Sequence, residues 1–119
     1  MVRKILYIED DVLLSSLVNI TLTKKGYEIN TVPTAEQALE TIKIFTPDII
    51  LLDIILPGMT GLQFLEIFRN KEQFKNTRVI VFTNLNRTTD IEQAEKLNAE
   101  FFIKAELTPD QLPALLEAK

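Results

Sequence analysis

The sequence predicts an α/β protein in which helices cover both faces of one parallel β-sheet. Five short apolar or β-branched segments alternate with five segments of helical period, and parallel strands need crossover connections of this kind. Three of the strand segments are apolar at almost every position, as strands buried on both faces are. A chain of 119 residues without an internal repeat is the size of one domain, which we expect over residues 1–119.

The expected strands and helices alternate along the whole chain. The strands are expected at Lys4–Ile8, Tyr27–Val32, Asp48–Leu52, Arg78–Thr83 and Phe101–Ile103. The first, third and fourth are apolar on both faces, which is typical of strands covered by helices on two sides. The helices are expected at Val12–Lys25, Ala35–Phe45, Leu62–Asn70, Thr89–Leu97 and Pro109–Ala118.

Boundary residues support the expected helices. Thr34 and Thr108 each stand three residues before a glutamine, which is the spacing of a capping box. Gly26 follows two lysines, as is typical of the end of a helix. Pro113 falls inside the last helical segment, so we expect that helix to be short or bent.

Composition excludes several classes of function. The net charge of −4 argues against a general nucleic-acid binder, which needs a basic face. The absence of cysteine and histidine excludes disulfides, thiolate metal sites and the usual general base, leaving carboxylates, hydroxyls and lysines for any chemistry. The apolar stretches are too short for a signal peptide or a membrane span, so we expect a cytoplasmic protein without a membrane partner.

Polar side chains gather at the carboxyl ends of the expected strands, where ligands bind in parallel sheets. Asp53 directly follows a buried apolar strand, and an unpaired buried charge is costly enough to require a partner or a use. The other residues at these strand ends are Glu9, Asp10 and Asp11 after the first strand, Thr83 and Asn84 at the fourth, and Lys104 at the fifth.

Each of these residues also has an ordinary structural interpretation. Asp11 is well placed as a helix N-cap, and Thr83 alone is a common strand residue. Lys104 alone would be a solvated lysine, and Asp53 would be a buried acid paired with it. Because four separate segments deliver these side chains to one edge of the sheet, their combination favours a functional site.

The combination of residues predicts a chemistry. Clustered Glu9, Asp10 and Asp53 repel one another unless a cation intervenes, and Mg²⁺ suits a site of this all-oxygen kind. Asp53 would then remain ionised and act as a nucleophile, since aspartyl phosphates are a known use of carboxylates. Thr83 and Lys104 would neutralise the oxygens of the phosphoryl group.

These segments resemble the receiver domain of bacterial two-component response regulators over essentially the whole chain. KILYIEDD resembles the first strand and acidic pair of that family, PDIILLDIILPGMTG the segment around the phosphorylated aspartate, VIVFTN the strand of the switch threonine, and FFIK the strand that ends in the lysine. The resemblance implies a flavodoxin-like, doubly wound five-stranded sheet in the order 2-1-3-4-5.

The resemblance also implies roles for individual residues. It implies that Glu9, Asp10, Asp53 and the backbone carbonyl of Ile55 hold Mg²⁺. It implies that Asp53 receives the phosphoryl group from a sensor histidine kinase or a histidine phosphotransfer protein. The protein would then be a phosphoacceptor with Mg²⁺-dependent phosphotransfer and autodephosphorylation, rather than an enzyme acting on a separate substrate.

Switching and output are likewise implied by the resemblance. Thr83 and Lys104 would bind the phosphoryl group, and Thr83 and Phe101 would change position on activation, although Phe101 is equally well interpreted as a core aromatic. A downstream effector protein would bind the face formed by the fourth helix, fifth strand and fifth helix. We expect a monomer or a weak homodimer on phosphorylation, and no direct contact with nucleic acid.

Three positions depart from the family pattern. Ala105 follows the lysine where receivers usually have proline, and Asn84 follows the threonine where the residue is usually small. Asn98 stands where glycine is common, and asparagine tolerates the left-handed conformation better than most residues. None of these departures removes a reacting group.

Other functions fit the sequence less well. A pseudo-receiver, which binds partners without phosphorylation, would not need the acidic pair with Asp53, Thr83 and Lys104. A phosphatase with an aspartate nucleophile needs a second acid two residues later, where this chain has Ile55. A nucleotide-binding enzyme needs a phosphate loop or a GxGxxG motif after the first strand, and neither is present.

Overall fold

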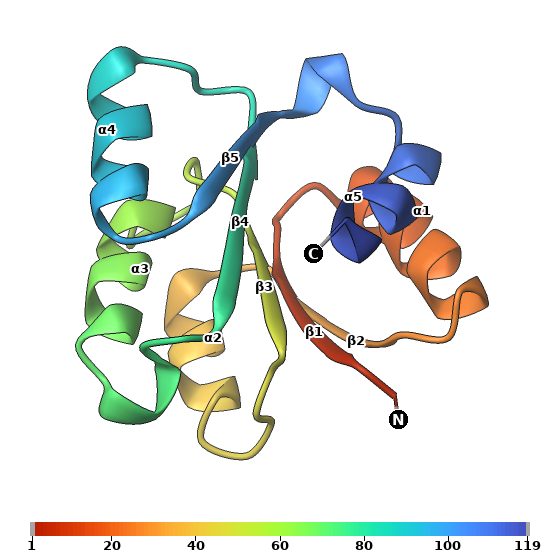
Figure 1. Cartoon of the computed structure of the whole chain (residues 1–119), viewed down its shortest axis with the longest axis horizontal. Coiled ribbons are helices and arrows are strands. Elements are labelled where there is room, and N and C mark those ends of the chain that lie inside the picture. The colour runs from red at the N-terminus through yellow and green to blue at the C-terminus, as the bar shows by residue number, and fades with distance from the viewer. Residues whose placement is uncertain (1, 119) are drawn as a thin grey trace.

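The computed structural model describes residues 2–118 and contains a five-stranded parallel sheet (Figure 1). The strands are β1 (Lys4–Ile8), β2 (Glu28–Val32), β3 (Ile49–Leu52), β4 (Arg78–Thr83) and β5 (Glu100–Ile103). Their order in the sheet is β2-β1-β3-β4-β5, with every adjacent pair parallel. The flavodoxin-like order implied by the resemblance is therefore confirmed.

Helices cover both faces of this sheet. They are α1 (Val12–Lys24), α2 (Ala35–Thr41), α3 (Gly61–Arg69), α4 (Thr88–Lys96) and α5 (Leu112–Glu117). Figure 1 shows α1 and α5 on one face and α2, α3 and α4 on the other. No helix among residues 2–118 combines the length and the apolar character needed to cross a membrane.

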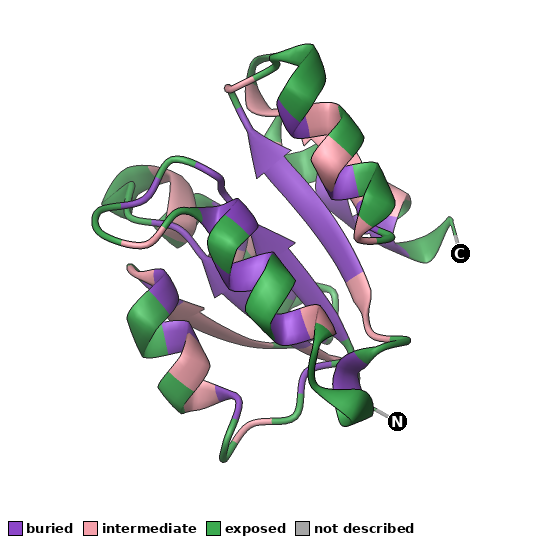
Figure 2. Ribbon diagram, turned by 90° about the vertical axis from the view of Figure 1, so that its left-hand side faces the viewer, coloured by how far each residue is buried: buried purple, intermediate pink, exposed green. Residues whose placement is uncertain are grey.

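The sheet separates two apolar cores because successive side chains of a strand point to opposite faces. On β1, Leu6 and Ile8 pack toward α2 and α3, whereas Ile5 and Tyr7 pack toward α1 and α5. The same alternation divides β3 and β4. In Figure 2 these strands are purple, and the helices show purple toward the sheet and green toward solvent. The apolar strand bodies are thus buried on both sides, as expected.

Two helix ends adopt the conformations that the sequence predicted. Gly26 has φ of 94° and Asn98 has φ of 58°, both in the left-handed region. After Gly26, the N–H of Tyr27 donates to the carbonyl of Leu22, and after Asn98 the N–H of Ala99 donates to the carbonyl of Ala94. These hydrogen bonds satisfy carbonyls that would otherwise lack partners at the helix ends.

The predicted end of α2 was wrong. The helix was expected to reach Phe45 but ends at Thr41. Beyond that point the N–H groups of Lys43 and Ile44 bond three residues back, in place of the four of an α-helix. Ile42 and Phe45 still pack against the core, but Ile44 between them is 91% exposed. The apolar spacing therefore continues past Thr41 although the segment is a turn and not part of the helix.

The last helical segment is divided, in agreement with the expectation that Pro113 shortens it. A 3₁₀ turn spans Pro109–Gln111, and α5 begins at Leu112. Pro113 lies in the first turn of α5, where its missing N–H would have no partner in any case. An α-helix from 109 to 118 would instead place the proline in the helix interior.

The side chain of Arg69, on α3, links the segments that lead into β4 and β5. Its guanidinium donates to the carbonyls of Leu97 and Asn98 at the end of α4 and to that of Phe74 before β4, at 2.8–2.9 Å. The planar group presents its donors in a fixed fork, so a single side chain joins three segments. The loops that enter β4 and β5 are consequently tied to one another.

Candidate functional site

The predicted site residues meet at the carboxyl edge of the sheet because the strand ladders continue into them. The N–H of Asp53 donates to the carbonyl of Ile8 at 3.1 Å, and the N–H of Glu9 donates to that of Val32 at 3.0 Å. These hydrogen bonds therefore hold the backbone of both acidic residues just beyond the ends of their strands. Their placement follows from the strand order rather than from their own side chains.

Three carboxylates lie together at this edge. Glu9 is 3% exposed and Asp53 is 4% exposed, whereas Asp10 is exposed. Each offers one oxygen that lies within 4.8 Å of the other two. Two buried acids and one accessible acid form an all-oxygen donor set of the kind that binds Mg²⁺, so the residues present fit the metal that the resemblance implies.

Lys104 lies between the two buried acids. Its Nζ is 2.6 Å from Oε1 of Glu9 and 2.7 Å from Oδ2 of Asp53, and its side chain is 13% exposed. Burial alone would lower the pKa of Lys104, but hydrogen bonds and charge from Asp53 and Glu9 outweigh burial and raise it. Lys104 is therefore an ion-pair partner of Asp53, not the solvated lysine that its sequence position alone allows.

Glu9 has two further partners. Burial raises its pKa, while the hydrogen bond and charge of Lys104 act in the opposite direction. The hydroxyl of Tyr7 donates to its Oε1 at 3.2 Å, and the N–H of Asp11 donates to its Oε2 at 3.1 Å. Asp11 also accepts from the N–H of Leu14 at 3.1 Å, which confirms it as the N-cap of α1.

Tyr7 was not identified from the sequence. It lies in an apolar strand, where a tyrosine is indistinguishable from any other core aromatic. Burial raises the pKa of its phenol, and the charge of Glu9 raises it further, so the hydroxyl keeps its proton and donates to the carboxylate. The one available signal is its position two residues before Glu9, since residues two apart in extended backbone point to the same side.

Local backbone hydrogen bonds orient Asp53 and Thr83. Oδ1 of Asp53 accepts from the N–H of Ile55 at 3.2 Å, and Oγ1 of Thr83 accepts from the N–H of Leu85 at 3.3 Å. Thr83 is fully buried. Because its oxygen is used here only as an acceptor, the hydroxyl proton remains able to donate to another group.

Ile55 and Leu85, the residues two positions beyond Asp53 and Thr83, differ in environment. Ile55 is 58% exposed, whereas Leu85 is partly buried against the core on the α2–α4 face of the sheet. Phe101 is also partly buried against that core and pairs with Val81 in the ladder of β4 and β5. Its position fits a core aromatic and a switch residue equally well.

The loop from Asp53 to α3 is held from both ends. Glu36 on α2 accepts the N–H of Met59 at 3.0 Å, and Thr60 forms a complete capping box with Gln63. At Gly61 a Cβ would overlap the carbonyl oxygen of Asp53 and lie 2.8 Å from Cα of Ile54. A glycine is therefore required for α3 to begin this close to the end of β3.

Asn84 and Ala105 connect two loops above the site. Oδ1 of Asn84 accepts from the N–H of Ala105 at 3.0 Å. Among the described residues every peptide bond is trans, the Lys104–Ala105 bond included. Two of the three positions at which the sequence departs from the receiver pattern are thus in direct contact.

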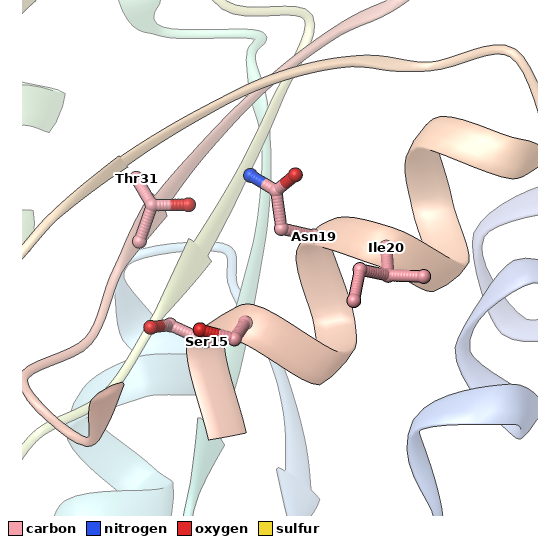
Figure 3. Close-up of a pocket in the computed structure, with 5 residues that line it drawn as sticks. Ser15, Asn19, Ile20 and Thr31 are labelled. Atoms are coloured by element: carbon pink, nitrogen blue, oxygen red, sulfur yellow. The ribbon is translucent and has the colours of Figure 1, made fainter. Parts of the chain in front are cut away.

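A hollow of about 380 Å³ lies elsewhere, between α1 and β2. Figure 3 shows Thr31 on the strand facing Asn19 on the helix, with Ser15 and Ile20 nearby. The lining contains hydroxyl and amide groups but no charged side chain. It therefore lacks the means to neutralise a metal ion or a phosphoryl group, unlike the acidic edge of the sheet.

The geometry at the acidic edge suits attack of a carboxylate on an electrophile that carries negative charge. Asp53 accepts a hydrogen bond from a lysine ammonium on one carboxylate oxygen and from a backbone N–H on the other. These two bonds hold the carboxylate in place for attack on an electrophile. The nearby acids supply cation ligands, and the hydroxyl and ammonium supply donors for developing negative charge.

Comparison with known proteins is consistent with this geometry. The family model of the response regulator receiver domain matches residues 5–117. The chain is 27% identical over 117 residues to the DNA-binding response regulator MtrA of Mycolicibacterium paratuberculosis, covering 98% of this chain and 51% of MtrA. The chain therefore spans about half the length of that relative.

Two other proteins are similar over most of their length. Sporulation initiation phosphotransferase F of Bacillus subtilis is 33% identical over 97 residues, which cover 82% of this chain and 77% of that protein. The structure of chemotaxis protein CheY4 from Vibrio cholerae aligns with a TM-score of 0.90 at 25% identity and covers 98% of both chains.

The close approach at Gly61 generates a prediction about stability. Gly61→Ala should lower the free energy of unfolding by about 3 kcal/mol, because the clash is with backbone and forces the strand end to move. Gly26→Ala is the matched control, since its Cβ meets nothing within 4 Å and only the left-handed conformation costs about 1 kcal/mol. Urea denaturation of both variants measures the difference, and equal losses would contradict the argument.

Proposed function

Because this chain belongs to the response regulator receiver domain family, we propose that it accepts a phosphoryl group on Asp53 and thereby changes the binding of a partner protein. The observation that carries the proposal is the pairing of Lys104 with both Glu9 and Asp53, at 2.6 and 2.7 Å. This pairing supports the proposal because it holds an ammonium group beside the carboxylate that would accept the phosphoryl group.

In this proposal Glu9, Asp10 and Asp53 bind Mg²⁺ together with the backbone carbonyl of Ile55. When bound, the metal supplies positive charge that offsets the oxygens of a transferring phosphoryl group. Tyr7 keeps Glu9 in position, since its hydroxyl donates to Oε1. The accessible Asp10 contributes the ligand on the solvent side of the site.

The phosphoryl donor would be a phosphohistidine of a sensor kinase or of a histidine phosphotransfer protein. A carboxylate oxygen of Asp53 forms a bond to phosphorus while the phosphorus–nitrogen bond breaks, and the histidine ring retains the electron pair. Lys104 and the hydroxyl of Thr83 then bind the phosphoryl oxygens. The name of the Bacillus relative, a phosphotransferase, supports this class of reaction.

Signal output would follow from movement of Thr83 toward the phosphoryl group, with Phe101 repositioned as the second switch residue. The effector would bind the face formed by α4, β5 and α5, and the chain would act as a monomer or a weak homodimer. We propose no direct contact with nucleic acid or membrane, and a cytoplasmic location. The complete set of acids, threonine and lysine gives the pseudo-receiver alternative no support.

The first test concerns the phosphorylated residue. Incubation with acetyl phosphate and Mg²⁺ should add one phosphoryl group to the wild type and none to Asp53→Asn, as read by intact-protein mass spectrometry. Asp48→Asn is the matched control, because Asp48 precedes β3 at the opposite end of the strand. Equal phosphorylation of wild type and Asp53→Asn would disprove the assignment.

The second test concerns the metal. Mg²⁺ at about 100 times its dissociation constant should stabilise the wild type by roughly 2.7 kcal/mol, seen as a rise of several degrees in Tm. Asp10→Asn should show little of this rise. Asp11→Asn should respond like the wild type, because asparagine also serves as an N-cap. A wild type whose Tm does not change in millimolar Mg²⁺ would refute the proposed metal site.

The third test concerns the lifetime of the phosphorylated state. Ile55 and Leu85 are apolar and cannot orient a water for attack on the phosphoryl group, so autodephosphorylation should be slow. An Ile55→Asn, Leu85→Glu double variant should lose phosphate about tenfold faster, which corresponds to roughly 1.4 kcal/mol in the barrier. Ile44→Asn, in the loop that enters β3, serves as the control. Unchanged kinetics in the double variant would show that these residues only pack.

A further inference from the structure

The hydrogen bond between Asn84 and Ala105 extends the ladder between β4 and β5. The last paired residues of these strands are Thr83 and Ile103, after which the two backbones separate. The Asn84 side chain then reaches across and accepts the N–H of Ala105 at 3.0 Å. One added link therefore joins the segment that carries Thr83 to the segment that carries Lys104.

The N–H of Ala105 is available because of the turn that follows β5. Lys104–Glu106 form a 3₁₀ turn whose N-cap residue, Ile103, provides no side-chain hydrogen bond. The first N–H groups of a helical turn have no backbone partner of their own. Asn84 thus caps this turn from a neighbouring loop, and a proline at position 105 would have no N–H to donate.

We propose that Asn84 is a positioning residue for Lys104: by capping the turn through Ala105, it fixes the backbone from which the lysine reaches the phosphoryl site. This inference rests on the proposed function, since it concerns the lysine that binds the phosphoryl group. The lysine side chain is long and has several rotatable bonds, so its ammonium is placed accurately only if its backbone is held. The strand ladder holds Lys104 on one side, and the Asn84 side chain holds it on the other.

The direct test compares variants at Asn84 for binding of beryllofluoride, an analogue of the phosphoryl group, in saturating Mg²⁺. Asn84→Ala should weaken the binding about fivefold, in keeping with the loss of one hydrogen bond. Asn84 is exposed, so truncation leaves no cavity and Tm should change little. Asn86→Ala, an exposed asparagine in the same loop, should bind like the wild type. Fluorine NMR reads the bound fraction in each case.

Amide hydrogen exchange tests the hydrogen bond independently of any ligand. The N–H of Ala105 should be protected in the wild type and should exchange faster in Asn84→Ala and not in Asn86→Ala. Asn84→Asp retains an acceptor oxygen at the same position, so it should restore the protection. Equal exchange of Ala105 in the wild type and Asn84→Ala would show that the cap does not exist and would overturn the inference.

A second background determines whether Asn84 acts through Lys104. In Lys104→Met, addition of Asn84→Ala should not weaken beryllofluoride binding further. A persistent fivefold loss would mean that Asn84 itself contacts the phosphoryl group, and the positioning role would be wrong. If the wild type binds and Asn84→Ala binds equally well, the positioning role alone fails. If the wild type does not bind beryllofluoride, the proposed function fails and the positioning role with it.

Discussion

The structure depends on the burial of two carboxylates of like charge at one edge of the sheet. Glu9 and Asp53 are almost fully enclosed, and Lys104 reaches both. Removal of one member of a buried ion pair leaves an uncompensated charge and costs about 3–5 kcal/mol. The lysine therefore stabilises the fold by the same contacts that place it beside Asp53, so a substitution at this position changes stability and the site together.

The surrounding elements are arranged around this constraint. The sheet order places β1 beside β3, which brings both acids to adjacent strand ends. Tyr7 and the N–H of Asp11 bond to Glu9, while Gly61 lets α3 begin against the carbonyl of Asp53. These contacts hold the acids through backbone groups and a neutral hydroxyl, so Lys104 is the cation that offsets their charge.

Much of this arrangement could be predicted from the sequence. The strand at Arg78–Thr83 was predicted correctly because an unbroken apolar run is a local signal. The left-handed conformation of Asn98 fits the resemblance to receivers, which commonly have glycine at that position. The end of α2 was predicted wrongly because the apolar spacing continues past Thr41 to Ile42 and Phe45, which still pack against the core. The backbone there bonds three residues back at Lys43 and Ile44, and the spacing of apolar residues does not show that change.

The contacts that could not be predicted join segments far apart in the chain. The role of Tyr7 depends on which way the side chain of Glu9 turns, and the Asn84–Ala105 bond depends on two loops meeting beyond the last paired residues of their strands. The residues themselves can be read in the sequence, where Asn84 and Ala105 are two of the three departures from the receiver pattern. What the sequence lacked was the distance between them, because only the folded sheet sets that distance.

The Arg69 contacts have a mechanical consequence for α4. The carboxyl end of this helix is held at the carbonyls of Leu97 and Asn98, and along its length only Asp90 and Ala94 are buried. Its other end follows the loop that leaves Thr83. A helix of nine residues is about 13 Å long, so the Arg69 contacts hold α4 at one end only. The position of its other end, at Thr88, is set by the loop that leaves Thr83 and by the packing of Asp90 and Ala94.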